Sequence, residues 1–174
     1  MYMVKIMTLG FNPVKMGLTN TYPNSLQEIE DIMQAMKNPD WEYFKLTDHS
    51  PKPAFQQYLS LNKLPVEDQS MQNIINQSYP VIIALKQYHN RPRPYQISNI
   101  KPAQSTTANT PAHPSGHALQ SYLISDMLSA KYPERKRDFK NIADRIANAR
   151  VSVGLHYPSD NDYAKRLSKE LSNY

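Results

Sequence analysis

The sequence predicts an all-α protein, a bundle of about six or seven helices in one domain. Apolar residues recur at steps of three and four in several segments, and no segment alternates apolar and polar residues at period two. Asn38-Pro39, the prolines of 48–53 and Pro133 fall between these segments, where helices end. With 174 residues the chain is long enough to bury a core, so we expect a single domain over residues 1–174.

The first half of the chain is predicted to hold short helices. Ser25 and Glu28 fit a capping box, and an apolar stripe follows them. A proline-rich break over 48–53 contains His49, which has no second ligand at helical spacing and is expected to be a surface loop residue. Residues 1–24 show no period and are expected to be irregular. The helices expected here cover about 26–37, 41–46 and 54–61.

Longer helical patterns follow. They cover about 67–88, 115–130, 134–153 and 158 to the end of the chain. Because proline lacks an N–H group, Pro80 must kink the first of them or begin a new helix. The polar segment 95–113 is long for a connector, so we expect it to form a functional rim that selects substrate.

Two cations continue apolar helix stripes, Lys86 in the first long pattern and Arg150 in the third. A charge on a buried face costs free energy unless an anion meets it. For Lys86 the alternative is a side chain that extends along the surface to solvent. For Arg150 the alternative is a structural ion pair with a carboxylate.

Composition excludes several classes of protein. The absence of cysteine excludes a disulfide scaffold, a thiolate zinc site and a cysteine nucleophile. The net charge of +5 is scattered apart from Lys131–Lys140, so we expect no nucleic acid as partner. The first twenty residues hold only short apolar runs, unlike a signal peptide, and no stretch reaches the roughly 18 apolar residues of a membrane span. We therefore expect a soluble, cytoplasmic enzyme, and a homo-oligomer is compatible with the sequence.

Three polar segments carry the residue types of phosphoryl-transfer chemistry. They are Lys86 to Pro94, Pro114 to His117 and Arg150 to Asp160. The second, Pro-Ser-Gly-His, lies where a helix is expected to begin, and the unpaired N–H groups and positive dipole end of a helix start favour an anion. Together the segments supply three cations, two histidines and a carboxylate, which fit the binding and transfer of a phosphate group.

The three segments resemble the superfamily of type 2 phosphatidic acid phosphatases, bacterial non-specific acid phosphatases and vanadium haloperoxidases. The pattern of that superfamily is Lys, six residues, Arg-Pro; then Pro-Ser-Gly-His; then Ser-Arg, five residues, His, three residues, Asp. The chain matches it in order and spacing over 86–160, except that Ala149 replaces the last Ser. About ten matched letters leave coincidence a negligible explanation. The resemblance implies a helical fold, in agreement with the periodicity.

The resemblance also implies roles for the matched residues. His156 would be the nucleophile that forms a phosphohistidine, with Asp160 holding its ring, and His117 would act as acid and then as base. No metal is required. Since Asp160 is the one carboxylate near these cations in sequence, we expect uncompensated positive charge in the empty site. The phosphate ligands implied are Lys86, Arg93, Ser115, Gly116 and Arg150.

Other assignments follow from the same reasoning. His89 and His113, close to the motif in sequence, are expected to be rim residues. The main alternative function is a vanadium haloperoxidase, in which the same residues hold vanadate as a cofactor with His156 as its ligand. The short chain favours a phosphatase without a cofactor, for which vanadate is an inhibitor. A non-catalytic phosphate-binding protein is the third alternative. The expected substrate is a phosphorylated small molecule or lipid, or a pyrophosphate.

Overall fold

The computed structural model describes residues 21–172, which form helices joined by loops and contain no strand. The predicted all-α class is therefore confirmed. The expectations for residues 1–20, an irregular segment without a signal peptide, lie outside the described residues. The elements are η1 (Ser25–Glu28), α2 (Ile29–Ala35), α3 (Trp41–Thr47), α4 (Lys52–Leu61), α5 (Asp68–His89), α6 (Pro94–Ile97), α7 (Gly116–Lys131), η2 (Pro133–Arg135), α8 (Lys136–Ser152) and α9 (Pro158–Ser172).

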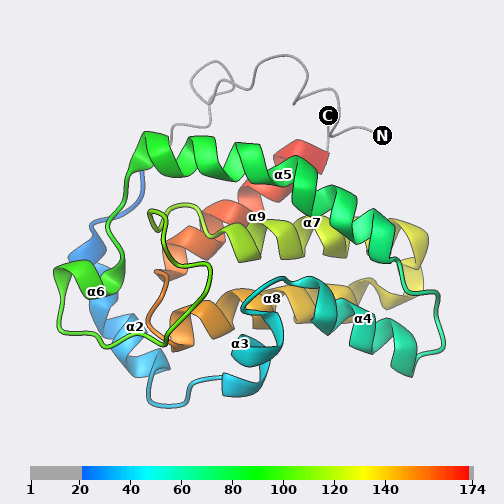
Figure 1. Ribbon diagram of the computed structural model, residues 1–174, viewed down its shortest axis with the longest axis horizontal. Coiled ribbons are helices and arrows are strands. Elements are labelled where there is room, and N and C mark those ends of the chain that lie inside the picture. Colours follow the sequence, from blue (N-terminus) through cyan, green and yellow to red (C-terminus); the bar gives the residue numbers. More distant parts are fainter. Residues whose placement is uncertain (1–20, 173–174) are drawn as a thin grey trace.

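Helix α7 is the central helix, and it packs against α5, α8 and α9 (Figure 1). Every residue from 118 to 125 is buried, so α7 has no solvent-facing side over these turns. A helix buried on all sides is typical of the interior of a bundle. The apolar core around it includes Phe55, Met71, Leu85, Leu119, Ile124, Leu128, Phe139, Ile146 and Leu167.

The helix directions bring the three polar segments together. The C-terminal ends of α5 and α8 and the N-terminal ends of α7 and α9 lie at the same end of the bundle (Figure 1). After α8, Gly154 has a φ of +78°, a conformation that glycine adopts readily, and the chain then turns into the segment that contains His156. The polar segments thus meet at one end of the bundle, although Lys86 and Asp160 are 74 positions apart in the sequence (160 − 86).

The capping box predicted at Ser25 and Glu28 is wrong. The side chain of Asn24 caps η1 by accepting the Leu26 N–H, while Ser25 and Glu28 both accept hydrogen bonds from Arg91. The helix expected over 26–37 is consequently a short 3-10 turn followed by α2. A buried guanidinium outcompetes the helix terminus for these two oxygen-bearing side chains because its N–H groups have no water to bind.

Helix α5 continues through Pro80, so no new helix begins there. Within residues 21–172, every helix is too short or too polar to cross a bilayer. The cytoplasmic location and the single domain stay predictions.

Candidate active site

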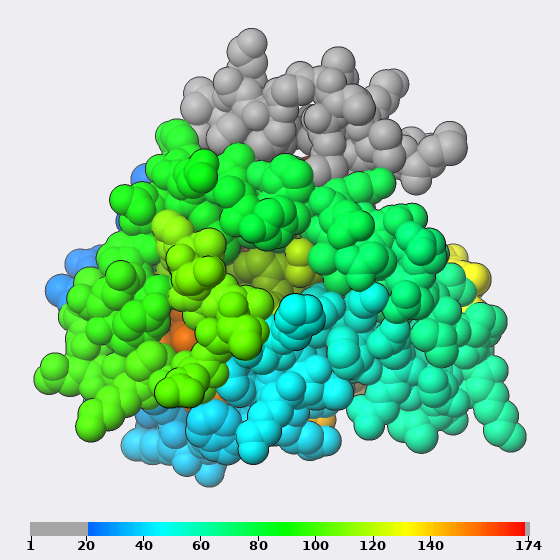
Figure 2. Space-filling model, viewed as in Figure 1, coloured from blue at the N-terminus to red at the C-terminus, as the bar shows by residue number. Residues whose placement is uncertain are grey.

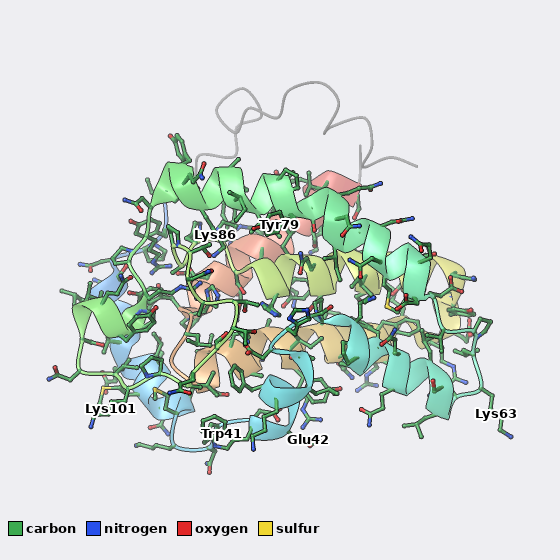
Figure 3. The ribbon with its side chains drawn as sticks, viewed as in Figure 1. Trp41, Glu42, Lys63, Tyr79, Lys86 and Lys101 are labelled. Atoms are coloured by element: carbon green, nitrogen blue, oxygen red, sulfur yellow. The ribbon has the colours of Figure 1, made fainter. Side chains whose placement is uncertain are left out.

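A cavity of about 320 Å³ opens between α5, the loop before α7 and the first turn of α7. Figure 2 shows this hollow between α5, the loop after α6 and the segment around α3 and α4. Tyr79 and Lys86 both lie on the side of α5 that borders it (Figure 3). Six of the eight predicted site residues line the cavity: Lys86, Arg93, Gly116, His117, Arg150 and His156.

The remaining two predicted residues, Asp160 and Ser115, are fully buried next to the cavity. Asp160 Oδ2 accepts a hydrogen bond from His156 Nδ1 at 3.0 Å, as the spacing of the two residues predicts. Burial acts to raise the pKa of Asp160, but hydrogen bonds from His113 and His156 hold it well below its ordinary value. Asp160 is therefore an ionised acceptor that fixes the orientation of the His156 ring.

The other nitrogen of the His156 ring is directed at a cation. Arg93 Nη1 lies 3.0 Å from His156 Nε2. A guanidinium can only donate, so Nε2 presents a lone pair and Nδ1 carries the proton. Burial and the charge of Arg93 lower the pKa of His156 well below its ordinary value, so the imidazole is neutral. A neutral imidazole whose Nε2 carries no proton is the form that can act as a nucleophile.

Lys86 is 4% exposed, and its amino group donates to the carbonyl oxygens of Pro111 and Ala112. The side chain does not extend to solvent, so the alternative of a surface lysine does not hold. Burial and the neighbouring Arg93 lower the pKa of Lys86 well below its ordinary value. Burial also lowers the pKa of Arg93, to about 10. Both groups are cations held away from water, and a bound anion would offset that cost.

At its start, α7 packs closely against α5 and carries a side-chain cap. The Ser115 hydroxyl caps the helix by accepting the Ala118 N–H at 3.3 Å. A Cβ atom at Gly116 would lie 3.3 Å from Ile82 Cγ2, so glycine allows α5 and α7 to come together here. Ser115 accepts through a lone pair, so its O–H is still a donor, although the side chain is fully buried and does not line the cavity.

His117 is held by the backbone of the segment after α3. Its Nε2 lies 3.0 Å from the carbonyl oxygen of Asp48, which can only accept, so Nε2 carries the proton. Its enclosed position and the charge of Arg150 lower the pKa of His117 to about 3. Nδ1 is then the ring nitrogen left for proton exchange with a ligand.

Asp48 is a site residue that the sequence analysis missed. Its Oδ1 accepts a hydrogen bond from Arg150 Nη1 at 2.7 Å, and the hydroxyls of Ser105 and Thr107 accept from Arg150 Nη2. Burial acts to raise the pKa of Asp48, but hydrogen bonds from Ser105, Arg150 and the Thr106 N–H hold it at about 2. No spacing signal connects Asp48 with Arg150, because the two are 102 positions apart.

The expectation that Asp160 is the one carboxylate near the cations is therefore wrong. Asp48 compensates Arg150, which is the structural ion pair that the sequence analysis gave as the alternative. The pair leaves part of the guanidinium unused, since Arg150 Nε is buried and has no hydrogen-bond partner among the described residues. A buried donor without a partner is costly, and an oxyanion in the cavity is one way to satisfy it.

The loop expected to form a rim does so. Thr106, Thr107, Asn109 and Thr110 line the cavity opposite α5, and exposed His49 lies at its mouth. The hydroxyls of Thr106 and Thr107 donate to Asp48, which ties this loop to the segment after α3.

The expectation that His89 and His113 are rim residues is wrong. Neither lines the cavity, and His113 is 1% exposed. The ring of His113 packs 4.6 Å from that of Tyr163, and its Nδ1 lies 3.0 Å from Asp160 Oδ1. A buried carboxylate needs donors for both oxygens, which draws this imidazole inward. The position of His113 directly before Pro114 was the one sequence feature that linked it to the site.

Ala149, where the superfamily pattern has Ser, is fully buried in a small apolar cluster with Phe44, Val153 and Leu155. The chain thus has apolar packing where the pattern supplies a hydroxyl.

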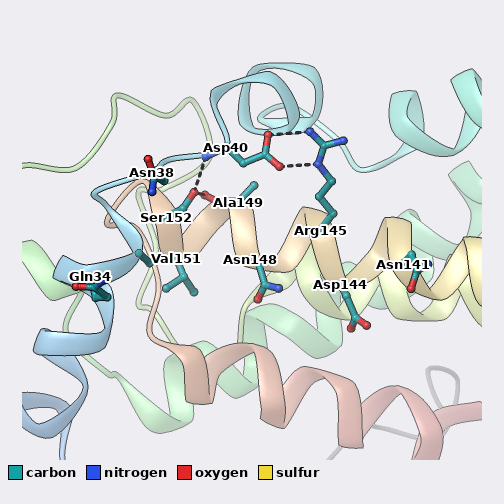
Figure 4. A pocket seen from close by; sticks show the side chains of 11 residues that line it. Gln34, Asn38, Asp40, Asn141, Asp144, Arg145, Asn148, Ala149, Val151 and Ser152 are labelled. Carbon is teal, nitrogen blue, oxygen red and sulfur yellow. Dashed lines mark hydrogen bonds and ion pairs between the residues drawn. The ribbon is translucent and has the colours of Figure 1, made fainter.

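A second hollow, of about 580 Å³, lies between α2 and α8 (Figure 4). Amide side chains such as Asn38 and Asn148 line it, and its Arg145 forms ion pairs with Asp40 and Glu42. No histidine and none of the predicted site residues line this hollow. The candidate chemistry is therefore gathered in the smaller cavity.

Known proteins match this chain in sequence and in fold. The sequence profile of the PAP2 superfamily matches residues 72–162, which is more than half of the chain. The chain belongs to the PAP2 superfamily. This range includes every predicted site residue, while Asp48 lies outside it.

Two curated relatives are non-specific acid phosphatases. The Salmonella typhi protein is 30% identical over 97 residues, which cover 53% of this chain and 39% of that protein. The Salmonella typhimurium protein is 30% identical over 88 residues, which cover 48% and 35%. The chain thus matches well under half the length of these relatives.

A solved structure shares the fold. It is described as the first transmembrane PAP2 type phosphatidylglycerolphosphate phosphatase from Bacillus subtilis, and it matches with a TM-score of 0.55 at 18% identity. The match covers 98% of this chain and 92% of that chain. At this identity the likeness shows the arrangement of the helices.

Proposed function

We propose that this PAP2 chain is a metal-independent phosphatase that hydrolyses phosphate monoesters, or a pyrophosphate, through a phosphohistidine intermediate. The observation that carries the proposal is the state of the His156 ring: Nδ1 donates to Asp160, and Nε2, which carries no proton, lies beside Arg93 in the cavity. The substrate class is a phosphorylated small molecule or lipid.

The phosphate group would occupy the cavity against three cations, Lys86, Arg93 and Arg150. Their N–H groups, with the Ser115 hydroxyl and the Gly116 N–H at the helix start, can match the charge on the equatorial oxygens in the transition state. A bound dianion raises the pKa of its neighbours, so His117 would take up a proton on binding.

The reaction has two displacements. His156 Nε2 attacks phosphorus as the bond to the leaving oxygen breaks, and His117 transfers a proton to that oxygen, which leaves as an alcohol. Neutral His117 then accepts a proton from a water molecule that attacks phosphorus, and the P–N bond breaks to release phosphate and regenerate His156. The carboxylate of Asp160 stabilises the positive charge on the His156 ring while the phosphoryl group is attached.

The proposal is tested with purified protein and a panel of alkyl, aryl and nucleoside phosphates and pyrophosphate. We expect phosphate release that persists in a metal chelator and is inhibited competitively by vanadate, since its trigonal-bipyramidal form resembles the transition state. Activity that disappears with the chelator and returns with a metal ion would contradict metal independence. If vanadate instead starts halide oxidation by peroxide, the haloperoxidase alternative holds.

The acid role of His117 gives a separate expectation. His117→Gln keeps a side-chain N–H that can donate to the Asp48 carbonyl but removes proton transfer. We expect the rate on an alkyl phosphate to fall about 10²–10⁴-fold, the usual contribution of general acid catalysis. The nitrophenyl ester, whose leaving group needs little protonation, serves as the control and should lose far less. Equal losses on both substrates in steady-state assays would remove the acid role.

A further inference from the structure

The carboxylate of Asp160 makes more contacts than orientation of His156 requires. Oδ2 accepts from His156 Nδ1 and from the Tyr157 N–H, each at 3.0 Å. Oδ1 accepts from Arg91 Nη1 at 2.7 Å and from His113 Nδ1 at 3.0 Å. With two donors on each oxygen, the plane of this fully buried carboxylate is fixed from both sides.

Arg91 is fully buried and bridges two carboxylates. Its Nη2 donates to Glu28 Oε2 at 2.7 Å, opposite the bond from Nη1 to Asp160. Its Nε donates to Ser25 Oγ at 3.0 Å, and the guanidinium carbon lies 3.7 Å from the centre of the Tyr157 ring. Each of the three nitrogens is thus engaged, and Arg91 does not line the cavity. It is placed to hold Asp160 rather than to bind a phosphate.

His113 holds the same oxygen from the other side. The ring is 1% exposed and packs against the rings of Tyr163 and His89, at 4.6 and 4.8 Å between centroids. Since Asp160 accepts, Nδ1 of His113 carries a proton, and Nε2 has no hydrogen-bond partner among the described residues. His113 thus gives Oδ1 a second donor besides Arg91.

We propose that Arg91 and His113 are positioning residues, which fix the Asp160 carboxylate so that His156 keeps its bare Nε2 directed into the cavity. The inference rests on the proposed phosphohistidine chemistry. The inference also gives η1 a role, although it lies before the three motif segments in the sequence, because its Glu28 and Ser25 hold Arg91 in place. Without the donors on Oδ1 the carboxylate can rotate about its side-chain bonds, and the imidazole can turn or change tautomer with it.

The test compares two variants of His113. The amide nitrogen of His113→Asn can take the place of Nδ1 and donate to Asp160, whereas His113→Leu fills the site without a donor. We expect His113→Leu to lower kcat about 10- to 100-fold, the loss that is typical when the hydrogen-bond partner of a metal-binding histidine is removed. His113→Asn should restore kcat to within about threefold of the parent. KM and the inhibition constant of phosphate should change little in both, because His113 does not line the cavity.

A second measurement does not depend on turnover. The ¹⁵N shifts of the His156 ring should report a protonated Nδ1 and a bare Nε2 in the parent and in His113→Asn, and a mixture of tautomers in His113→Leu. Should His113→Leu fail to fold, Arg91→Lys replaces it. Lysine keeps the charge but cannot bridge Glu28 and Asp160, so the same loss of kcat and the same mixture are expected.

The outcomes separate this inference from the proposed function. A folded His113→Leu protein with parental kcat and a single His156 tautomer would overturn the positioning role. A His113→Leu protein that loses thermal stability but keeps its kcat would also overturn it. Equal losses of kcat in His113→Asn and His113→Leu would do the same. A parent protein that hydrolyses no phosphate compound would instead refute the proposed function, and the ring shifts would still decide whether Arg91 and His113 hold Asp160.

Discussion

Replacement of His156 by alanine is expected to lower kcat by at least about 10⁴-fold, in line with the loss of a catalytic nucleophile in other enzymes. His156 Nε2 is the bare ring nitrogen that lies among the cavity cations, and removal of the ring leaves no second nucleophile at that position. The measurement is steady-state hydrolysis of a nitrophenyl phosphate.

Phosphate binding provides the control for this variant. The three cations remain in His156→Ala, so phosphate should still stabilise the protein, by about 2.7 kcal/mol at a hundredfold excess over its dissociation constant. A thermal melt with and without phosphate therefore separates loss of chemistry from loss of the fold. Turnover near the parental rate in a variant that still binds phosphate would show that another group attacks phosphorus.

Arg150→Met is expected to abolish turnover, to remove the stabilisation by phosphate and to destabilise the empty protein. The sequence alone favours a variant at least as stable as the parent, because methionine suits an apolar stripe. The structure reverses that expectation, since Asp48 would lose its cation in a largely buried place. We expect a loss of about 1–3 kcal/mol, less than the 3–5 kcal/mol typical of a fully buried pair. The reason is that the Asp48 side chain is 18% exposed and keeps the donors Ser105 and Thr106.

Two further variants complete this experiment. Asp48→Asn in the Arg150→Met background should recover much of the lost stability, because no unpaired charge remains. Arg145→Met is the matched control: Arg145 lies on α8 as well but is exposed and pairs with Asp40 outside the cavity. It should keep its activity and lose less than about 1 kcal/mol. Chemical denaturation gives the free energies of unfolding. If Arg150→Met still gains stability from phosphate, the role of Arg150 is structural and it does not bind phosphate.

The pH dependence of stability follows from the same ion pair. The pKa of Asp48 in the folded protein, about 2, lies below its ordinary value of 3.8. The contribution of the pair is therefore complete above about pH 4 and is lost as the pH falls toward 2. The stability difference between the parent and Asp48→Asn should shrink over that range.

The long helices could be predicted from the sequence because their apolar periodicity is itself the cause of their burial. Helices α5, α8 and α9 lie where the stripes predict them, and α7 does as well. The ends of the first helices were less certain, since the side chains that could cap a helix have other partners in the folded protein. Ser25 and Glu28 are the example: local spacing favours a cap, and a buried arginine 63 positions from Glu28 takes both.

The candidate site divides in the same way. The six predicted residues that line the cavity come from three segments with fixed spacing, so the sequence pattern locates them. The groups that hold these residues in place lie outside that pattern. Asp48, Arg91 and His113 act through pairs that are 102, 69 and 47 positions apart, and no local rule connects the partners. The packing of α3, α5, α7, α8 and α9 at one end of the bundle brings them together.

The central claim is that the phosphoryl group passes through His156, and trapping of the intermediate tests it most directly. Protein mixed with a ³²P-labelled substrate and quenched within one turnover should carry phosphate that is labile in acid and stable in base. After digestion in base, the label should lie on the peptide that contains His156 and be absent from His156→Ala. Label on another residue, or a burst of product without any phosphorylated protein, would contradict the account.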